Sequence, residues 1–159
     1  MPTINVQRTI PAPIEDVFDW LSTATNYTKT AGVLRVQLAE PGEDGGFGNG
    51  AVREVLAGAG WFREVISEHH RPNAFDYLIT KSRPRLIHRS GQMRFKEVDG
   101  GTQVTWTSVF DVPSRIAAGP LGQLLVRVGT LGFGSVLRTA ERDLARQDGL
   151  RSQASSSTN

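Results

Sequence analysis

The stretch GPLGQLLVRVGTLGFGSVLRTAERDLARQ, residues 119–147, contains the one long helical pattern of this sequence. Pro120 stands where a first-turn proline would, because the missing N–H of proline costs nothing at that position. Arginines recur every four residues and mark a face that we expect to be exposed: Arg138, Arg142 and Arg146. The apolar residues form two stripes that are rotated relative to each other, Leu121, Leu124, Leu125, Val128 and Leu131 on one and Phe133, Val136, Leu137, Ala140 and Leu144 on the other.

Gly129, Gly132 and Gly134 lie where the two stripes change phase. Each interior glycine costs a helix about 1 kcal/mol relative to alanine, so something other than helix propensity must favour them. They predict either a bend between two helical pieces or a space left empty beneath the helix. Alternatively, small residues simply let a buried helix approach a sheet closely. The pattern does not choose between these interpretations.

The chain before this helix has the pattern of one strand, two short helices and about six further strands. Residues 3–10 alternate as a half-buried strand that carries Arg8 on its apolar side, and residues 14–22 and 23–30 favour short helices. Residues 33–38 then alternate, with Leu34, Val36 and Leu38 on one face. The remaining strands are expected at residues 50–57, 61–70, 73–80, 91–98 and 102–112.

An antiparallel sheet whose long helix comes last would most simply bury that helix across its concave face. We therefore predict an α+β fold, with a curved antiparallel sheet of about seven strands wrapped around a long C-terminal helix. The length of 159 residues fits one domain. We place it at residues 1–148 and expect residues 149–159 to form a disordered polar tail.

The composition excludes several kinds of site. Cysteine is absent, which rules out thiol catalysis and thiolate metal sites, and the net charge of +2 is too small to favour nucleic acid. We see no signal peptide and no apolar run long enough to span a bilayer, so we expect a cytoplasmic protein without integral membrane association. His69 and His70 are neighbours on a strand and cannot ligate one metal ion together. We predict no metal and no cofactor, and the oligomeric state is not predicted.

Three passages carry a resemblance to a known family: IPAPIEDVF at residues 10–18, the proline-containing hairpin at residues 65–77, and GTQVTW at residues 101–106. In this order and spacing they resemble the START-like (SRPBCC) superfamily and, within it, the polyketide cyclase/dehydrase and lipid transport family. The resemblance covers residues 3–147 and implies a helix-grip fold. It also implies a cavity between sheet and helix that takes lipids, polyketides, sterols or other apolar molecules. The chain departs from the family pattern at Thr23, where an acidic residue is frequent, and at residues 28–30, where a tryptophan is frequent.

The residues and the resemblance together predict which side chains line this cavity. We expect a small hydrophobic ligand to contact Tyr77, Met93, Phe95, Trp106, Ser108, Phe110, Val128, Gly132 and Val136. Tyr77 and Trp106 are the preferred candidates, because a phenol or an indole offers one hydrogen bond together with a large apolar surface. Plain core aromatics would have the same pattern.

No catalytic motif with a defined spacing is present. Glu64 enters the cavity if its strand turns Phe62, Glu64 and Ile66 inward, but Trp61, Arg63 and Val65 satisfy the same alternation. We expect His88 to be a surface histidine rather than a general base, since the basic residues around it disfavour a proton on its ring: Lys81, Arg85 and Arg89.

Three functional hypotheses follow. The first is a non-enzymatic module that binds a small hydrophobic ligand. The second is a cyclase, aromatase or dehydratase that acts on a poly-β-keto chain with Tyr77, Glu64 and His88 as proton donors and acceptors. The third is a regulatory interaction module that uses the arginine face of the helix or the basic segment 81–89. That segment is usually only a solvated loop, but it could meet an anionic head group, a membrane surface or an acidic partner.

Overall fold

The computed structural model describes residues 1–111 and 119–158. The elements are β1 (Thr3–Ile10), α1 (Ile14–Ser22), the 3-10 helix η1 (Ala24–Lys29), β2 (Val33–Glu40), β3 (Val52–Ala57), β4 (Gly60–His70), β5 (Ala74–Arg83), β6 (Ile87–Val98), β7 (Gly101–Asp111) and α3 (Pro120–Ser156). The last residue of the strand predicted at 102–112 lies outside the described residues. The strands form one antiparallel sheet in the order β1-β7-β6-β5-β4-β3-β2.

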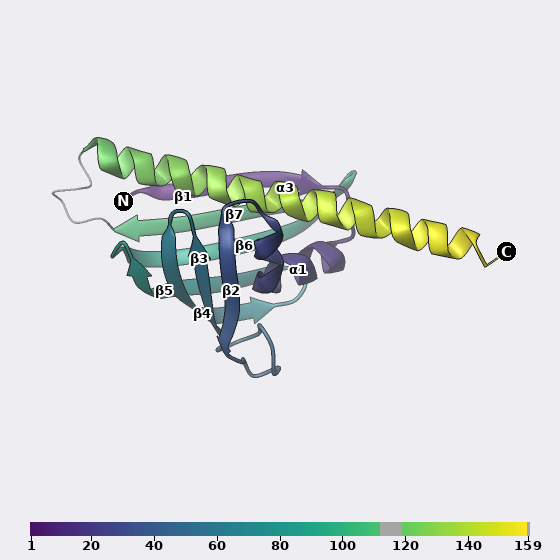
Figure 1. The fold of residues 1–159 in the computed structure, drawn as a ribbon, viewed down its shortest axis with the longest axis horizontal. Coiled ribbons are helices and arrows are strands. Elements are labelled where there is room, and N and C mark those ends of the chain that lie inside the picture. The colour runs from purple at the N-terminus through teal and green to yellow at the C-terminus, as the bar shows by residue number, and fades with distance from the viewer. Residues whose placement is uncertain (112–118, 159) are drawn as a thin grey trace.

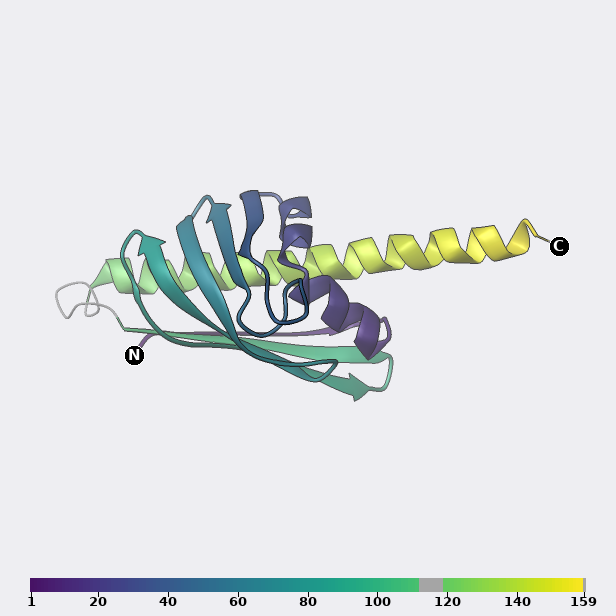
Figure 2. The ribbon, with the colours of Figure 1, turned by 90° about the horizontal axis from the view of Figure 1, so that it is seen from below.

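The sheet curves, and α3 runs across its concave side (Figures 1 and 2). The prediction of an α+β fold with seven strands, two short helices and a long C-terminal helix is therefore confirmed. From β2 to β7 each strand pairs with the next one in sequence, and β1 pairs with β7, so β1 and β2 are the two edge strands. α3 packs against β1 and, further along, against α1 and η1.

α3 is one continuous helix rather than two pieces joined by a bend. A Cβ added to Gly129 would lie 2.2 Å from Cδ1 of Ile4, so this glycine allows the helix to approach β1 closely. A Cβ added to Gly132 would have no atom within 4 Å, so this glycine faces open space. The two remaining interpretations therefore both hold, each at a different glycine, and the predicted bend is wrong.

The C-terminal part of α3 differs from the disordered tail that we predicted for residues 149–159. The helix continues through Ser156, and these last turns are exposed to solvent. Serine hydroxyls in this segment donate to carbonyl oxygens of the preceding turn, as Ser156 does to Gln153, and Arg151 lies 3.6 Å from a carboxylate oxygen of Asp16. Backbone hydrogen bonds along a helix that is already nucleated make these turns less costly than they are in an isolated peptide. The domain boundary at residue 148 stays a prediction.

By length and composition alone, α3 is apolar enough to cross a membrane, which contradicts our expectation that no such stretch exists. Residues 120–137 carry a single charge, on Arg127. The leucines and valines among them keep the mean hydropathy of the segment high despite its glycines. Only 17% of the most apolar stretch is buried. The first half of α3 therefore exposes much of its apolar surface to solvent.

The solid core lies under the second half of α3. Phe18 of α1 contacts Phe75 and Phe95 edge to face, at ring-centroid distances of 5.8 and 5.0 Å. The helix adds its own fully buried apolar residues to this cluster, Leu137 and Ala140 among them. This packing fixes the position of α3 along the sheet.

One predicted strand face is wrong at its first residue. Val36 and Leu38 of β2 pack against the core, but Leu34 is 70% exposed. The pairing of β2 with β3 shifts register between Val33 and Arg35, and such an irregularity turns the residue between them to the other face.

Candidate functional site

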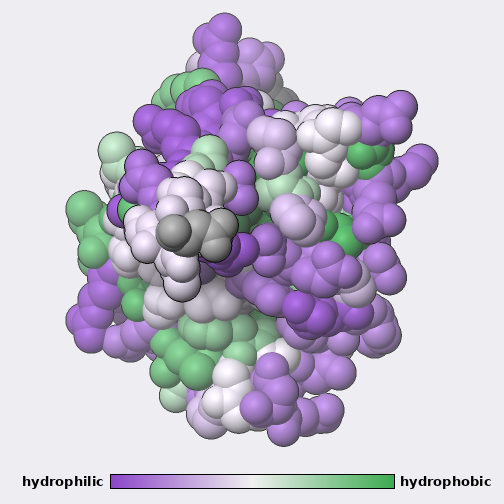
Figure 3. All heavy atoms as spheres, turned by 90° about the vertical axis from the view of Figure 1, so that its right-hand side faces the viewer, coloured by the Kyte–Doolittle hydropathy of each residue, from purple (hydrophilic) through white to green (hydrophobic). Residues whose placement is uncertain are grey.

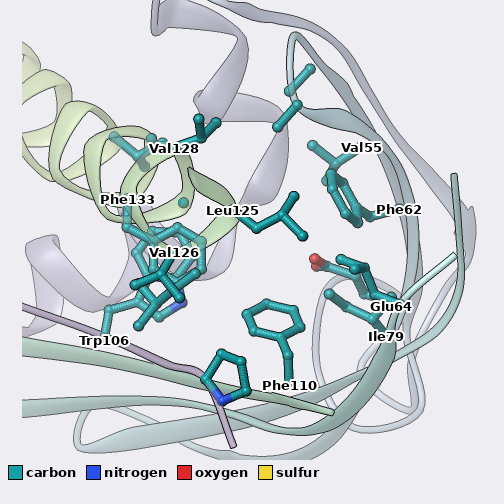
Figure 4. Close-up of a pocket in the computed structure, with 18 of the residues that line it drawn as sticks. Val55, Phe62, Glu64, Ile79, Trp106, Phe110, Leu125, Val126, Val128 and Phe133 are labelled. Atoms are coloured by element: carbon teal, nitrogen blue, oxygen red, sulfur yellow. The ribbon is translucent and has the colours of Figure 1, made fainter. Parts of the chain in front are cut away.

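A cavity of about 180 Å³ lies between the first half of α3 and the sheet. Its walls come from α3, from β1 and β7, and from the hairpin region of β3, β4 and β5 (Figure 4). Most of the lining side chains are apolar: Ile4, Val55, Phe62, Ile79, Leu86, Phe110, Leu125, Val126, Val128, Phe133 and Val136. Gly129 and Gly132 both line this space, and at Gly129 only a hydrogen atom separates the backbone of α3 from the side chain of Ile4.

One ion pair lies in this otherwise apolar wall. Nε of Arg53 donates to Oε2 of Glu64 over 2.6 Å, and both side chains are buried. Arg53 on β3 pairs directly with Glu64 on β4, so both side chains point to the same face of the sheet. Of the two alternations left open by the sequence, the structure therefore has Phe62, Glu64 and Ile66 inward.

Arg53 is only 1% exposed and sits among aromatic rings. Its guanidinium carbon lies 5.6 Å from the ring centroid of Tyr27 and 5.4 Å from that of Tyr77, which are cation–π distances. Burial disfavours the charged form, but the adjacent Glu64 outweighs this and holds the pKa of Arg53 above its ordinary value. Nη1 of Arg53 is buried and has no hydrogen-bond partner within the described part of the chain. One charged N–H group of Arg53 in the cavity wall is thus left without a partner among the described residues.

Tyr77 presents a neutral phenol to the same cavity. Its oxygen accepts a hydrogen bond of 2.8 Å from Nε1 of Trp106. Its ring lies flat on β6 at Gly91, where an added Cβ would come within 2.2 Å of the ring. Burial, with a smaller contribution from Glu64, raises the pKa of Tyr77 well above its ordinary value. The phenol therefore keeps its proton at neutral pH and can donate it in a hydrogen bond.

His88 lies behind Tyr77 and is 7% exposed, so the prediction of a surface histidine is wrong. The two rings stack at 5.4 Å. Nδ1 of His88 accepts from the backbone N–H of Ile79 over 2.9 Å, which leaves Nε2 to donate to Oγ of Ser108 over 2.8 Å. Burial lowers the pKa of His88 to about 4. The predicted direction is correct, but desolvation is the cause, not the basic neighbours in sequence.

The structure brings together some of the predicted site residues and separates others. Those that line the cavity are Glu64, Tyr77, Trp106, Phe110, Val128, Gly132 and Val136. His88 and Ser108 do not line it, because they bond to each other beneath Tyr77. Met93 and Phe95 are buried in the solid core further along β6, where Phe95 packs against Phe18 of α1. They share a strand face with the cavity residues but not a position along the strand.

Arg53 and Tyr27 are cavity residues that the sequence interpretation missed. The register of the β3–β4 hairpin could have identified Arg53. If Ala57 is opposite Gly60 at the turn, the residues four positions further from the turn on each strand are Arg53 and Glu64, and they pair. An arginine opposite a glutamate would have been a signal for an ion pair on one face. No local pattern points to Tyr27, because its contact with Arg53 depends on how η1 packs.

The histidine pair at the end of β4 also lies away from the cavity. His69 is half-buried, with its ring 5.1 Å from that of Phe18, whereas His70 is exposed and lies 3.1 Å from Glu68. In the described ranges, no group of three or more histidine, cysteine, aspartate or glutamate residues is placed to hold a metal ion.

A curved antiparallel sheet that holds one long helix above an apolar cavity defines a protein of the helix-grip class. Within this class, the chain belongs to the polyketide cyclase/dehydrase and lipid transport family, whose sequence model matches residues 1–147. The resemblance inferred from the three sequence passages is thereby confirmed. No curated protein sequence matches the chain.

Solved structures with the same fold differ widely in sequence. TTHA0849 from Thermus thermophilus is 19% identical and superposes with a TM-score of 0.76, covering 92% of this chain and 99% of that one. Ara h 8.0201 is 17% identical (TM-score 0.71, coverage 91% and 97%), and the Zhui aromatase/cyclase from Streptomyces sp. R1128 is 18% identical (TM-score 0.68, coverage 89% and 94%). At these identities the likeness establishes the fold alone.

Proposed function

We propose that this protein binds a small, mainly apolar organic molecule in the cavity under α3 and does not change it chemically. The cavity carries this proposal. Its volume of about 180 Å³ exceeds the roughly 150 Å³ of an apolar cavity that stays dry and takes up benzene. Membership of a family associated with hydrophobic ligands supports the same assignment. A ligand on the order of one or two rings, or a short chain, fits this size.

The ligand we propose carries at least one oxygen that accepts hydrogen bonds. Nη1 of Arg53 is a buried charged donor without a partner among the described residues, and the phenol of Tyr77 can donate beside it. A buried donor left unsatisfied costs about 1–3 kcal/mol, which an acceptor on the ligand would recover. A ketone, ester or similar neutral carbonyl suits the site better than a carboxylate, because Glu64 already balances the charge of Arg53.

The binding test uses two glycines of the same helix. Gly132→Phe places a ring at the cavity, whereas Gly134→Phe is the matched control, because Gly134 does not line it. We expect 1-acetonaphthone to bind the wild type and the control, and to bind Gly132→Phe about tenfold more weakly, as overpacking by 1–3 kcal/mol implies. Calorimetry or ligand-observed NMR measures the affinities.

The matched hydrocarbon tests the polar anchor. 1-Ethylnaphthalene has nearly the same shape but no oxygen, and we expect it to bind about tenfold more weakly than the ketone. Equal affinities would contradict a role of Arg53 and Tyr77 in anchoring. A protein that carries no organic molecule after purification and takes up neither probe would contradict the binding function itself.

A cyclase-type enzyme is the second candidate, because Glu64, which points into the cavity (Figure 4), and Tyr77 both line it. Two observations favour binding over catalysis. Glu64 is held in an ion pair with Arg53, which weakens it as a base, and both ring nitrogens of His88 are engaged outside the cavity. Cyclisation of a poly-β-keto thioester that is lost in Tyr77→Phe or Glu64→Gln but kept in His88→Ala would establish the enzymatic alternative.

A further inference from the structure

Polar side chains are rare in the wall of the cavity, although they are abundant on the protein surface. Seen from the C-terminal end of α3, the surface is mainly hydrophilic (Figure 3). The described residues that line the cavity include five with polar side-chain atoms: Tyr27, Arg53, Glu64, Tyr77 and Trp106. Because these groups are so few, the hydrogen bonds that each of them can still form decide which ligands fit.

Most of these polar groups already bond within the protein. The hydroxyl of Tyr27 donates to a carbonyl oxygen of α1, and the indole N–H of Trp106 donates to the oxygen of Tyr77 over 2.8 Å. Arg53 and Glu64 bond to each other, with Nη1 of Arg53 left over. The proton of Tyr77 likewise has no acceptor among the described residues, and Glu64 acts on the phenol through its charge alone.

The oxygen of Tyr77 is positioned by a row of three residues across neighbouring strands. Tyr77 on β5 lies opposite Gly91 on β6, which lies opposite Ser108 on β7. Residues opposite one another share a face of the sheet, so a side chain at position 91 would separate Tyr77 from Ser108. A Cβ added to Gly91 would come within 2.2 Å of Cζ of Tyr77. Because position 91 is a glycine, the phenol ring can lie across β6 and place its oxygen next to β7.

On β7 the phenol oxygen meets two donors. Trp106 and Ser108 are two residues apart on this strand, so their side chains lie on the same face of the sheet. Burial raises the pKa of Tyr77, whereas hydrogen bonds from Trp106 and Ser108 act in the opposite direction, as donors to a phenol oxygen do. A phenol oxygen that accepts two hydrogen bonds has only its own proton left to offer to a ligand.

His88 fixes the direction in which Ser108 donates. The backbone N–H of Ile79 donates to Nδ1 of His88 over 2.9 Å, and a backbone N–H group can only donate. The proton of the neutral ring is therefore on Nε2 and is directed at Oγ of Ser108, 2.8 Å away. Ser108 is fully buried and bonds to no other described residue than His88 and Tyr77, so its own proton is directed at Tyr77.

We propose that Tyr77 is the residue that determines which ligands the cavity accepts, with Gly91, Ser108 and His88 as its positioning residues. The hydrogen bonds run in one direction, from the backbone through His88 and Ser108 to Tyr77, and such a chain strengthens each of its members. The phenol thus presents a proton and no free lone pair. It selects ligands with an oxygen that accepts at this point, such as ketones and esters, and offers nothing to a group that only donates. This inference rests on the proposed ligand binding and assigns its chemical selectivity to one residue.

The experiment compares the affinities for 1-acetonaphthone and 1-ethylnaphthalene in variants of the two cavity tyrosines. Tyr77→Phe removes the donated proton and should lower the preference for the ketone about fivefold, which is the size of one net hydrogen bond. Tyr27→Phe is the matched comparison, because it also removes a phenol hydroxyl from the cavity wall, but one that already donates to α1. It should change both affinities by the same factor and leave the preference for the ketone as it is in the wild type. Calorimetry measures the affinities.

Infrared spectroscopy of bound 1-acetonaphthone tests the positioning residues. A donated hydrogen bond lowers the stretching frequency of the ketone carbonyl, so Tyr77→Phe should raise this frequency and Ser108→Ala should raise it part of the way. Ser108→Thr keeps the hydroxyl and should bring the frequency back. Thr102→Val is the control, because it removes another buried hydroxyl of β7, which donates to the backbone of Ala12, and it should leave the frequency unchanged.

The ligand-free protein tests the direction of the hydrogen bonds. NMR of the ring nitrogens should find the proton of neutral His88 on Nε2, and a proton on Nδ1 would overturn the proposal. So would an equal preference for the ketone in Tyr77→Phe and in the wild type, a result that would leave the proposed ligand binding intact. Wild-type protein that takes up neither probe would contradict ligand binding itself, and this inference with it.

Discussion

The two halves of α3 belong to one continuous helix but face opposite kinds of surroundings. The first half lies beside a cavity whose lining continues to Val136, and it leaves Leu121, Leu124 and Leu131 exposed, whereas the second half buries Leu137, Ala140 and Leu144 in a solid core. In the first half, Gly129 and Gly132 have no side chains that could fill the cavity. In the second half, α1 packs against the helix and covers it. One helix can therefore hold the fold together with one half while the other half remains available for a ligand.

Each half also has its own buried charged group. Beneath the first half, Arg53 and Glu64 pair in the cavity wall with one donor left over. In the second half, Asp143 accepts hydrogen bonds from Nε1 of Trp20 over 2.8 Å and from Nζ of Lys29 over 2.7 Å. The carboxylate in the second half ties α3 to α1 and η1, while in the first half Nη1 of Arg53 has no hydrogen-bond partner among the described residues.

The largest expected effect concerns the pair in the cavity wall. Arg53→Met leaves Glu64 buried without a partner, and we expect the free energy of unfolding to fall by about 3–5 kcal/mol. Arg63→Met is the matched control, since Arg63 pairs with Glu40 and Glu54 where solvent is accessible, and it should cost about 1 kcal/mol or less. Urea denaturation measures both. If Arg53→Met with Glu64→Leu is no more stable than Arg53→Met alone, the destabilisation does not come from an unpaired charge.

The next effect compares packing in the two halves of α3 directly. Leu137→Ala removes a fully buried side chain from the solid core and should lower the free energy of unfolding by about 3 kcal/mol. Leu125→Ala removes the same atoms beside existing empty space and should cost about 1 kcal/mol, because fewer contacts are lost. Thermal and urea unfolding give the two values. Equal costs would mean that the cavity is closed by repacking in solution.

A smaller, pH-dependent effect is expected at Asp143. Burial would raise the pKa of its carboxyl, but hydrogen bonds from Lys29, Trp20 and Arg146 outweigh burial and hold the pKa well below its ordinary value. A depressed carboxyl pKa stabilises the folded state above the ordinary value of 3.8 and loses that contribution as the pH falls below about 5. Asp143→Asn should therefore be less stable than the wild type by about 1–2 kcal/mol at pH 7, with the difference shrinking in acid. A difference that does not change with pH would exclude an ionised Asp143 as the cause.

The smallest effect is spectroscopic and concerns the wall behind Tyr77. Burial lowers the pKa of His88 to about 4, so its ring should stay neutral from pH 8 to below pH 5. His70, which is exposed, serves as the internal reference. NMR titration of the ring protons should give a midpoint near pH 4 for His88. A midpoint above pH 6 would mean that this wall opens to solvent. Because the folded-state pKa is depressed, protonation below the ordinary value of 6.5 favours the unfolded state.

Much of the site was visible in the sequence because period-two patterns assign side chains to faces. Tyr77, Trp106 and Phe110 were placed on inward faces and do line the cavity. Met93 and Phe95 satisfied the same rule but lie further along the sheet, since alternation carries no information about position along a strand. Glu64 stayed ambiguous for a related reason: one strand by itself has two equivalent faces, and only the partner strand distinguishes them.

The sequence by itself determined the order of elements, the antiparallel sheet and the terminal helix, because local periodicity, turns and helix-start signals specify them residue by residue. Tertiary structure alone decided that Arg53 pairs with Glu64 and that His88 is buried. It also decided that a cavity lies between the first half of α3 and the sheet, and that leucines on the outer side of this half are exposed. These features depend on register between strands and on the height of a helix above a sheet. Both are set by packing between segments far apart in the chain, which no local pattern records.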